Sequence, residues 1–310
     1  MAKEIKTIGL PRALLYHRYG SLWESFFSEL GIKTILSQPS NRALLERGSA
    51  LAIDESCLSF KLFLGHVDAL LGKCDAIFIP RYSNYGRDIV FCTRFESLYD
   101  QVCNIFRSTD QRFITCNVDV QDGKTEENAF LLLGKELGYG AKEVRGAWRT
   151  AEKAFRKEQQ ARLKAQAEKG KEPRLKILVT GHSYILSDAY VGRPVFQALE
   201  QLDTIPLRGD IVDQSAALRA SGRFSPTLRW VTNRELMGSV LLHKDDVDGI
   251  ILVSAFPCGP DAMVNDLLIR RLKDKPILNL VLDGQSGSAG METRLESFVD
   301  ILRFQKGEVL

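Results

Sequence analysis

Short apolar runs alternate along the chain with segments whose apolar residues recur at helical spacing. Several of these runs are almost wholly apolar, which is typical of strands buried on both faces of a parallel sheet. The predicted strands span residues 6–10, 32–37, 74–80, 112–118, 175–181, 248–255 and 276–283. Because helical patterns lie between them, the sequence predicts an α/β fold with doubly wound parallel sheets.

The first helical pattern follows the first predicted strand. Ser21 and Glu24 have the spacing of a capping box, so the helix is predicted to begin at Ser21 and to end at Gly31. Its apolar face would be formed by Trp23, Phe26, Phe27 and Leu30. Such a stripe packs a helix against a sheet.

Two long helical patterns, at residues 126–138 and 141–169, divide the strands into two groups. A new buried strand begins at Leu175, after a Gly- and Pro-containing break. We therefore predict two Rossmann-like domains joined by a helical arm. The boundaries are 1–125 for the N-terminal domain, 126–173 for the connector and 174–310 for the C-terminal domain.

The chain has 310 residues, 45% of them hydrophobic, which is enough for two cores. Its net charge of +3 comes from residues 151–176, which hold nine Lys and Arg against four Glu, so the remainder is slightly acidic. This distribution argues against a nucleic-acid groove and favours a solvated helical face. Neither a membrane-spanning run nor a signal peptide is visible, so we expect a cytoplasmic protein without a membrane partner.

Six cysteines occur, and in a cytosolic chain metal ligation, catalysis or core packing is expected ahead of disulfides. Cys116 alternates with apolar neighbours along a predicted strand, and Cys103 lies one helical turn after Tyr99. Both are predicted to be core residues. Cys74 precedes a strand, and its role stays open.

Cys57, Cys92 and Cys258 share a different setting, because each lies at or near a predicted helix start. Helix N-termini stabilise thiolates, and their free N–H groups can donate to the sulfur of a bound cluster. Ligand sites in open α/β sheets gather beyond the carboxyl ends of the strands, where Cys258 is predicted to lie. The spacings match no ferredoxin or zinc-finger pattern, so spacing alone leaves a metal site and a structural role open.

Other polar residues also follow strands. His182 lies at the end of a predicted strand. Its ring either faces a cleft or forms hydrogen bonds within its own turn. His66 is expected to be a packed core histidine. Arg12 and Arg81 either contact an anionic ligand or brace a loop. Asp261 is expected to cap the helix that follows Cys258.

Several of these stretches resemble the 2-hydroxyacyl-CoA dehydratase D-component family, and most closely its activase-related branch. They include IGLPRALLYHRYGSLWESFFSELGI (8–32), AIDESCLSFKLFLGHVDALL (52–71), FCTRF (91–95), TGHSYILSDAY (180–190), FPCGPDAMVNDLLIRR (256–271) and SGSAGMETRLESFVDIL (286–302). The resemblance implies two Rossmann-like domains with an iron–sulfur cluster between them. Its three cysteine ligands would be Cys57, Cys92 and Cys258, with His182 as the candidate catalytic residue.

The resemblance also implies partners. Relatives receive electrons from a separate ATP-dependent activase of the acetate-kinase/actin type, and this chain has no G-x-x-x-x-G-K-[ST] motif of its own. The cofactor would be a 4Fe-4S cluster, single or sulfide-bridged as a double cubane. A homo- or heterodimer and an acyl-CoA substrate are further implied.

The chain departs from the family pattern at Gln285 and Ser288, where relatives carry acidic or imidazole groups. These departures put a dehydratase activity in doubt more than they do the cluster. Three functions therefore stay open. They are an iron–sulfur electron-accepting or reductase component, a dehydratase subunit that removes water from an acyl-CoA by radical chemistry, and a metal-free module that binds a small anion or nucleotide.

Overall fold

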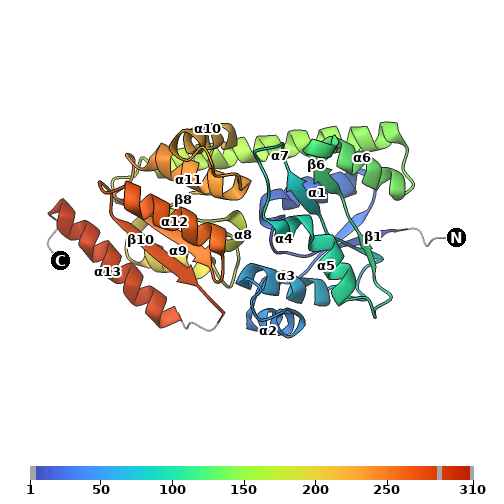
Figure 1. The fold of residues 1–310 in the computed structure, drawn as a ribbon, viewed down its shortest axis with the longest axis horizontal. Coiled ribbons are helices and arrows are strands. Elements are labelled where there is room, and N and C mark those ends of the chain that lie inside the picture. Colours follow the sequence, from blue (N-terminus) through green and yellow to red (C-terminus); the bar gives the residue numbers. More distant parts are fainter. Residues whose placement is uncertain (1–4, 285–287, 308–310) are drawn as a thin grey trace. The chain divides into compact units, whose positions relative to one another are not determined.

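Two four-stranded parallel sheets form the framework of the chain, which confirms the predicted doubly wound α/β class (Figure 1). The computed structural model describes residues 5–284 and 288–307. In the first sheet the strand order is β2 (Lys33–Leu36), β1 (Thr7–Leu10), β3 (Ala76–Phe78) and β5 (Arg112–Ile114). In the second it is β10 (Ile277–Leu282), β9 (Gly249–Ala255), β7 (Leu175–Thr180) and β8 (Thr204–Arg208).

In each sheet, successive strands are added first on one side of the starting strand and then on the other. The first sheet begins at β1, adds β2 on one side and then β3 on the other. The second begins at β7, adds β8 on one side and then β9 on the other. Such switch points leave a crevice beyond the carboxyl ends of the two central strands, which is where ligands bind in open α/β sheets.

Helices connect the strands. The elements up to residue 169 are α1 (Tyr16–Glu29), α2 (Arg42–Leu51), α3 (Leu58–Asp68), β4 (Arg81–Asn84), α4 (Thr93–Glu96), α5 (Leu98–Ile105), β6 (Asn117–Asp119), the 3-10 helix η1 (Val120–Asp122), α6 (Glu126–Glu136) and α7 (Ala141–Lys169). Those that follow are α8 (Ser183–Leu186), α9 (Arg193–Gln201), α10 (Gln214–Phe224), α11 (Val231–His243), α12 (Gly259–Arg271) and α13 (Ser288–Lys306).

The predicted strands are all present, each slightly shorter, and the run 112–118 is divided between β5 and β6. The strand β8 was not predicted because Pro206 lies in its middle. Proline is tolerated there because β8 is at the edge of its sheet. The predicted start of the first helix at Ser21 is wrong. The helix α1 begins at Tyr16, and buried Tyr19 extends its inner face toward the N-terminus.

Aromatic side chains fill the core around the first sheet. The ring of Phe130 on α6 lies 4.8 Å from those of Phe26 and Trp148, and the Trp23 ring lies 5.2 Å from Phe78. The core around the second sheet is aliphatic instead. It includes Leu178, Ile205, Met237, Ile250, Leu252 and Leu268.

The chain divides into two compact units, each containing one of these sheets. The first comprises the described residues up to Asp54 together with Phe60–Glu158, and the second comprises Glu55–Ser59 together with the described residues from Gln159 onward. The short segment Glu55–Ser59 thus belongs to the second unit, although its neighbours on both sides belong to the first. The domain boundaries predicted at residues 125 and 174 stay predictions.

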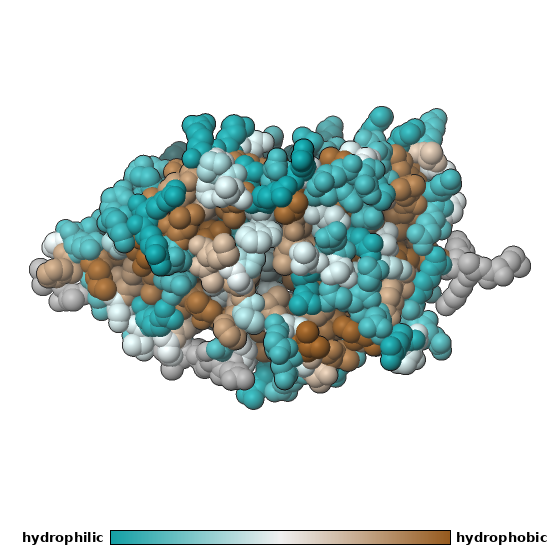
Figure 2. Space-filling model, viewed as in Figure 1, coloured by the Kyte–Doolittle hydropathy of each residue, from teal (hydrophilic) through white to brown (hydrophobic). Residues whose placement is uncertain are grey.

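Along α7 the side chains are largely hydrophilic where Figure 2 shows them, as expected for a solvated helical face. No helix within residues 5–284 or 288–307 has the length and apolar character needed to cross a bilayer.

Candidate functional site

Each of the three cysteines singled out from the sequence immediately precedes a helix. Cys57 precedes α3, Cys92 precedes α4 and Cys258 occupies the N-cap position of α12. All three side chains are partly exposed. Their predicted placement at helix starts is therefore confirmed, while their role as metal ligands stays a prediction.

Cys57 and Cys258 come together within the second unit. The backbone N–H of Leu58 donates to the carbonyl oxygen of Phe256 at 3.0 Å, which holds the two cysteine-bearing segments side by side. The two thiols are near enough to interact electrostatically. Cys92 belongs to the first unit. Among the residues that the structure describes, no three His, Cys, Asp or Glu side chains form a ready-made metal site.

A buried polar cluster lies at the switch point of the second sheet. His182 follows the end of β7, and its Nε2 atom lies 2.6 Å from Oδ1 of Asp261. The side-chain amide of Asn233, in the first turn of α11, donates to the same oxygen at 2.7 Å. All three side chains are at most 5% exposed. Asp261 is not the predicted N-cap, because Cys258 takes that position and Asp261 lies within the first turn of α12.

The burial and charge of the cluster shift the pKa values of Asp261 and of the neighbouring Cys258. Burial alone would raise the pKa of the Asp261 carboxyl, but the adjacent His182 ring and the Asn233 amide outweigh it and hold that pKa below its usual value. Burial and the Asp261 carboxylate together raise the pKa of the Cys258 thiol well above its ordinary value, although the Asp261 backbone N–H acts in the opposite direction. Oδ2 of Asp261 is buried and has no hydrogen-bond partner in the described part of the chain.

Cys57 and Cys258 fit the chemistry of iron–sulfur ligation as a pair. They lie together, precede helix N-termini and are partly exposed, so neither residue is sealed in a core. A thiol must lose its proton to bind iron. The raised pKa of Cys258 means that ligation would displace a proton from this sulfur.

The remaining cysteines differ among themselves. Cys116 is 1% exposed, which confirms its predicted place in the core. Cys103 was predicted to be a core residue, but it is partly exposed because Leu98 and Val102, not Cys103, form the buried face of α5. The Cys74 sulfur donates to the Leu70 carbonyl at 3.7 Å.

Other predicted residues have structural partners. His66 is fully buried, and its ring nitrogens lie 2.7 Å from the Ser37 hydroxyl and 2.9 Å from the Ser40 hydroxyl, which confirms the packed core histidine. Arg81 pairs with Asp100, and this contact favours the loop-bracing interpretation. The backbone N–H of Arg12 donates to the Ser37 hydroxyl at 2.8 Å.

Sequence reasoning missed one residue of the site and singled out two others, Gln285 and Ser288. Asn233 was missed, because an asparagine near a helix start gives no signal that it will meet Asp261. Gln285 lies outside the described residues. Ser288 begins α13, but its side chain is not among those described.

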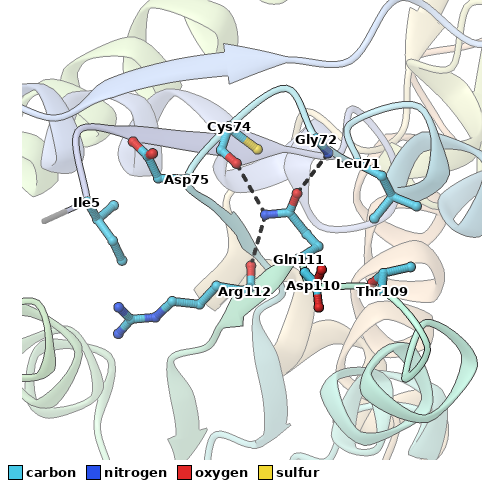
Figure 3. A pocket seen from close by; sticks show the side chains of 9 residues that line it. All are labelled: Ile5, Leu71, Gly72, Cys74, Asp75, Thr109, Asp110, Gln111 and Arg112. Carbon is cyan, nitrogen blue, oxygen red and sulfur yellow. Dashed lines mark hydrogen bonds between the residues drawn. The ribbon is translucent and has the colours of Figure 1, made fainter. Parts of the chain in front are cut away.

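A pocket of about 600 Å³ lies in the first unit at the amino ends of β1, β3 and β5 (Figure 3). Its polar groups form hydrogen bonds with one another and with the neighbouring backbone. Asp75 accepts hydrogen bonds from the backbone N–H and the hydroxyl of Thr7, and the Gln111 side chain bridges Gly72, Cys74 and Arg112. Because ligands gather at the opposite, carboxyl ends of such sheets, this pocket is not the candidate site.

Comparison with known proteins gives one family. The model described as the CoA enzyme activase uncharacterised domain (DUF2229) matches residues 7–212, which is more than half of the chain. No curated protein matches.

Solved structures with low similarity include two of the SBP FpvC from Pseudomonas aeruginosa. One, with Mn²⁺, has 12% identity, 97% coverage of this chain, 98% of that chain and a TM-score of 0.31. The other, with Ni²⁺, has 12% identity, 99% coverage of both chains and a TM-score of 0.29. A structure of ZnuA has 10% identity, 96% and 98% coverage and a TM-score of 0.25. Scores this low carry no argument about fold or function.

Proposed function

We propose, on the premise that this chain belongs to the CoA enzyme activase uncharacterised domain family, that it is the iron–sulfur, electron-accepting component of a CoA-enzyme activation system. In this proposal Cys57, Cys92 and Cys258 supply thiolates to a 4Fe-4S cluster. The observation that carries the proposal is the meeting of Cys57 and Cys258 at the carboxyl edge of the second sheet, although they are far apart in sequence.

The cluster would supply one-electron chemistry at a potential set by its surroundings. The chain's own contribution is positional. Cys258 occupies the N-cap position of α12, and the Leu58 to Phe256 hydrogen bond keeps Cys57 alongside. His182 is 5% exposed and bonded to Asp261, so we assign it the role of orienting that carboxylate.

Partners follow from the same proposal. A separate ATP-dependent activase of the acetate-kinase/actin type would deliver the electron in the cytoplasm, since the chain carries no P-loop motif for binding nucleotide phosphates. We also propose that the chain is a D-component of this system, which acts with a second subunit or a second copy and takes an acyl-CoA substrate.

Anaerobic reconstitution with iron and sulfide tests the proposal. The wild-type chain should take up about four irons and give an EPR signal on reduction. Cys258→Ala should lose uptake, whereas Cys116→Ala, in the core, and Cys103→Ala, at a partly exposed position, should retain it. Iron-free wild-type protein, or equal iron in all variants, would contradict the proposal. Release of water from a 2-hydroxyacyl-CoA by reduced protein would identify it as a dehydratase subunit.

A further inference from the structure

We propose that the open edge of β10 is a dimerisation surface, at which this strand pairs in antiparallel orientation with β10 of a second copy of the chain. The pairing would join the second sheets of two copies into one continuous sheet about a two-fold axis. The surface lies within the second unit and requires no bound iron, so its test is independent of the proposed function.

The backbone of β10 directs hydrogen-bonding groups to its open side. The strand is the outermost of its sheet, with β9 as its neighbour. The parallel register, in which the Phe256 N–H donates to the Leu282 carbonyl at 2.8 Å, turns the even-numbered residues of β10 toward β9. The backbone N–H and C=O groups of Ile277, Asn279 and Val281 therefore point away from β9, toward the open side.

A side-chain contact agrees with this direction. The guanidinium group of Arg294, on α13, donates to the outward carbonyl oxygen of Asn279. Within the described part of the chain, the outward backbone groups of Ile277 and Val281 have no hydrogen-bond partner. Charged side chains protect the edge strands of many sheets. Pairing with a second strand would displace Arg294 from the Asn279 carbonyl.

Exposed apolar side chains lie at this edge. Val281 is 44% exposed, and Ile301 and Phe304 on α13 are 52% and 77% exposed. Because Ile301 follows Arg294 by two helical turns, it lies on the side of α13 from which Arg294 reaches β10. Strands that are kept apart commonly carry lysine, proline or a bulge. β10 has none of these, and Asn279 is its one polar residue.

The sequence of β10 is complementary to itself in one antiparallel register. With Asn279 opposite the partner's Asn279, Ile277 lies opposite the partner's Val281, so the outward backbone groups of the two strands meet. The same register places Lys275 opposite the partner's Asp283 at both ends of the pair. The Lys275 ammonium donates to a backbone carbonyl at 2.8 Å and keeps further donors for a carboxylate. This match of apolar and charged positions favours a second copy as the occupant of the edge.

Sedimentation across a broad range of micromolar concentrations tests the proposal. The wild-type chain should form a dimer, and Arg294→Ala should strengthen it. Val281→Pro removes an outward N–H and leaves the bonds to β9 in place, so the dimer should be lost. Val281→Thr keeps this N–H and the β-branched shape and should retain the dimer. Leu242→Lys, at a similarly exposed apolar position on α11, should also retain it.

A cross-link tests the register without the proline variant. Directly opposite residues of an antiparallel hydrogen-bonded pair have Cα atoms about 5.5 Å apart, a separation that a disulfide spans. In a chain with Ala at positions 57, 74, 92, 103 and 258, and with buried Cys116 retained, Asn279→Cys should cross-link two copies on mild oxidation. Ile277→Cys should not, because it faces the partner's Val281. A monomeric wild-type chain, a dimer insensitive to Val281→Pro, or equal cross-linking at both positions would overturn the proposal.

Discussion

Nε2 of His182 lies 2.6 Å from Oδ1 of Asp261, although the two residues are 79 positions apart in the sequence. Both side chains are buried, so water does not readily replace this contact when it is lost. Removing one member of such a pair leaves the other desolvated and incompletely compensated. The pair therefore links the end of β7 to the first turn of α12 energetically as well as spatially.

Replacing His182 tests this link. We expect His182→Ala to lower the free energy of unfolding by about 3 kcal/mol, because it leaves the buried Asp261 carboxylate with the Asn233 amide as its hydrogen-bond donor from another element of the described chain. Urea unfolding at pH 7 measures the loss. His243→Ala, at a partly exposed position on α11, is the control and should cost at most about 1 kcal/mol. Equal losses would contradict the proposed coupling.

Close packing between α2 and α3 gives a second prediction. A Cβ added at Gly48 would overlap the carbonyl oxygen of Lys61, and one added at Gly65 would overlap that of Leu44. Because backbone atoms cannot move aside as a flexible side chain does, Gly48→Ala should destabilise the chain by about 2–3 kcal/mol. The measurement is the midpoint of urea unfolding.

The control for Gly48→Ala is Gly146→Ala on α7, where nothing lies within 4 Å of an added Cβ. Alanine has a higher helix propensity than glycine, so this change should raise stability by about 0.5–1 kcal/mol. The two variants should therefore change the free energy of unfolding in opposite directions, and this difference distinguishes steric overlap from helix propensity. A Gly48→Ala chain as stable as the wild type would show that α2 and α3 are not in close contact.

The buried histidine of the first unit predicts an acid-sensitive stability. Burial, followed by the positive charges of His17 and Arg12, lowers the pKa of His66 from 6.5 to about 3. Between pH 3 and pH 6.5, His66 is protonated in the unfolded chain but stays neutral in the folded chain. Stability from this residue is therefore complete above pH 6.5 and is lost as pH falls toward 3, at about 1.4 kcal/mol per pH unit.

Unfolding measured at pH 6.5 and pH 4.5 tests the assignment. The wild-type chain should lose roughly 2–3 kcal/mol more than His66→Gln over this interval, because glutamine does not titrate. Ser40→Ala keeps the imidazole and should retain most of the pH dependence. Parallel curves for the wild type and His66→Gln would remove His66 as the cause.

Local pattern was sufficient to predict most of the framework. The strand β9 is buried at every residue and has one polar side chain, Ser254, and α7 was predicted with its observed limits because no Pro interrupts it. The position of Cys258 at a helix start also followed from a strand, a turn and a helical pattern in succession. These features depend on neighbours within about ten residues.

The rest of the site depends on contacts between distant segments. The sequence near Asn233 contains no sign that α11 will direct an amide at Asp261. Asp261 was interpreted as a cap because Asp is common there, whereas its side chain instead turns inward to His182. The association of Glu55–Ser59 with the second unit arises from tertiary packing and has no local signature.

This association has a genetic consequence. A recombination event at residues 158 and 159 would give each descendant one nearly intact sheet, but Cys57 would be inherited with one half and Cys258 with the other. The half that begins at residue 159 would therefore lack the segment Glu55–Ser59, which belongs to the same unit as Cys258.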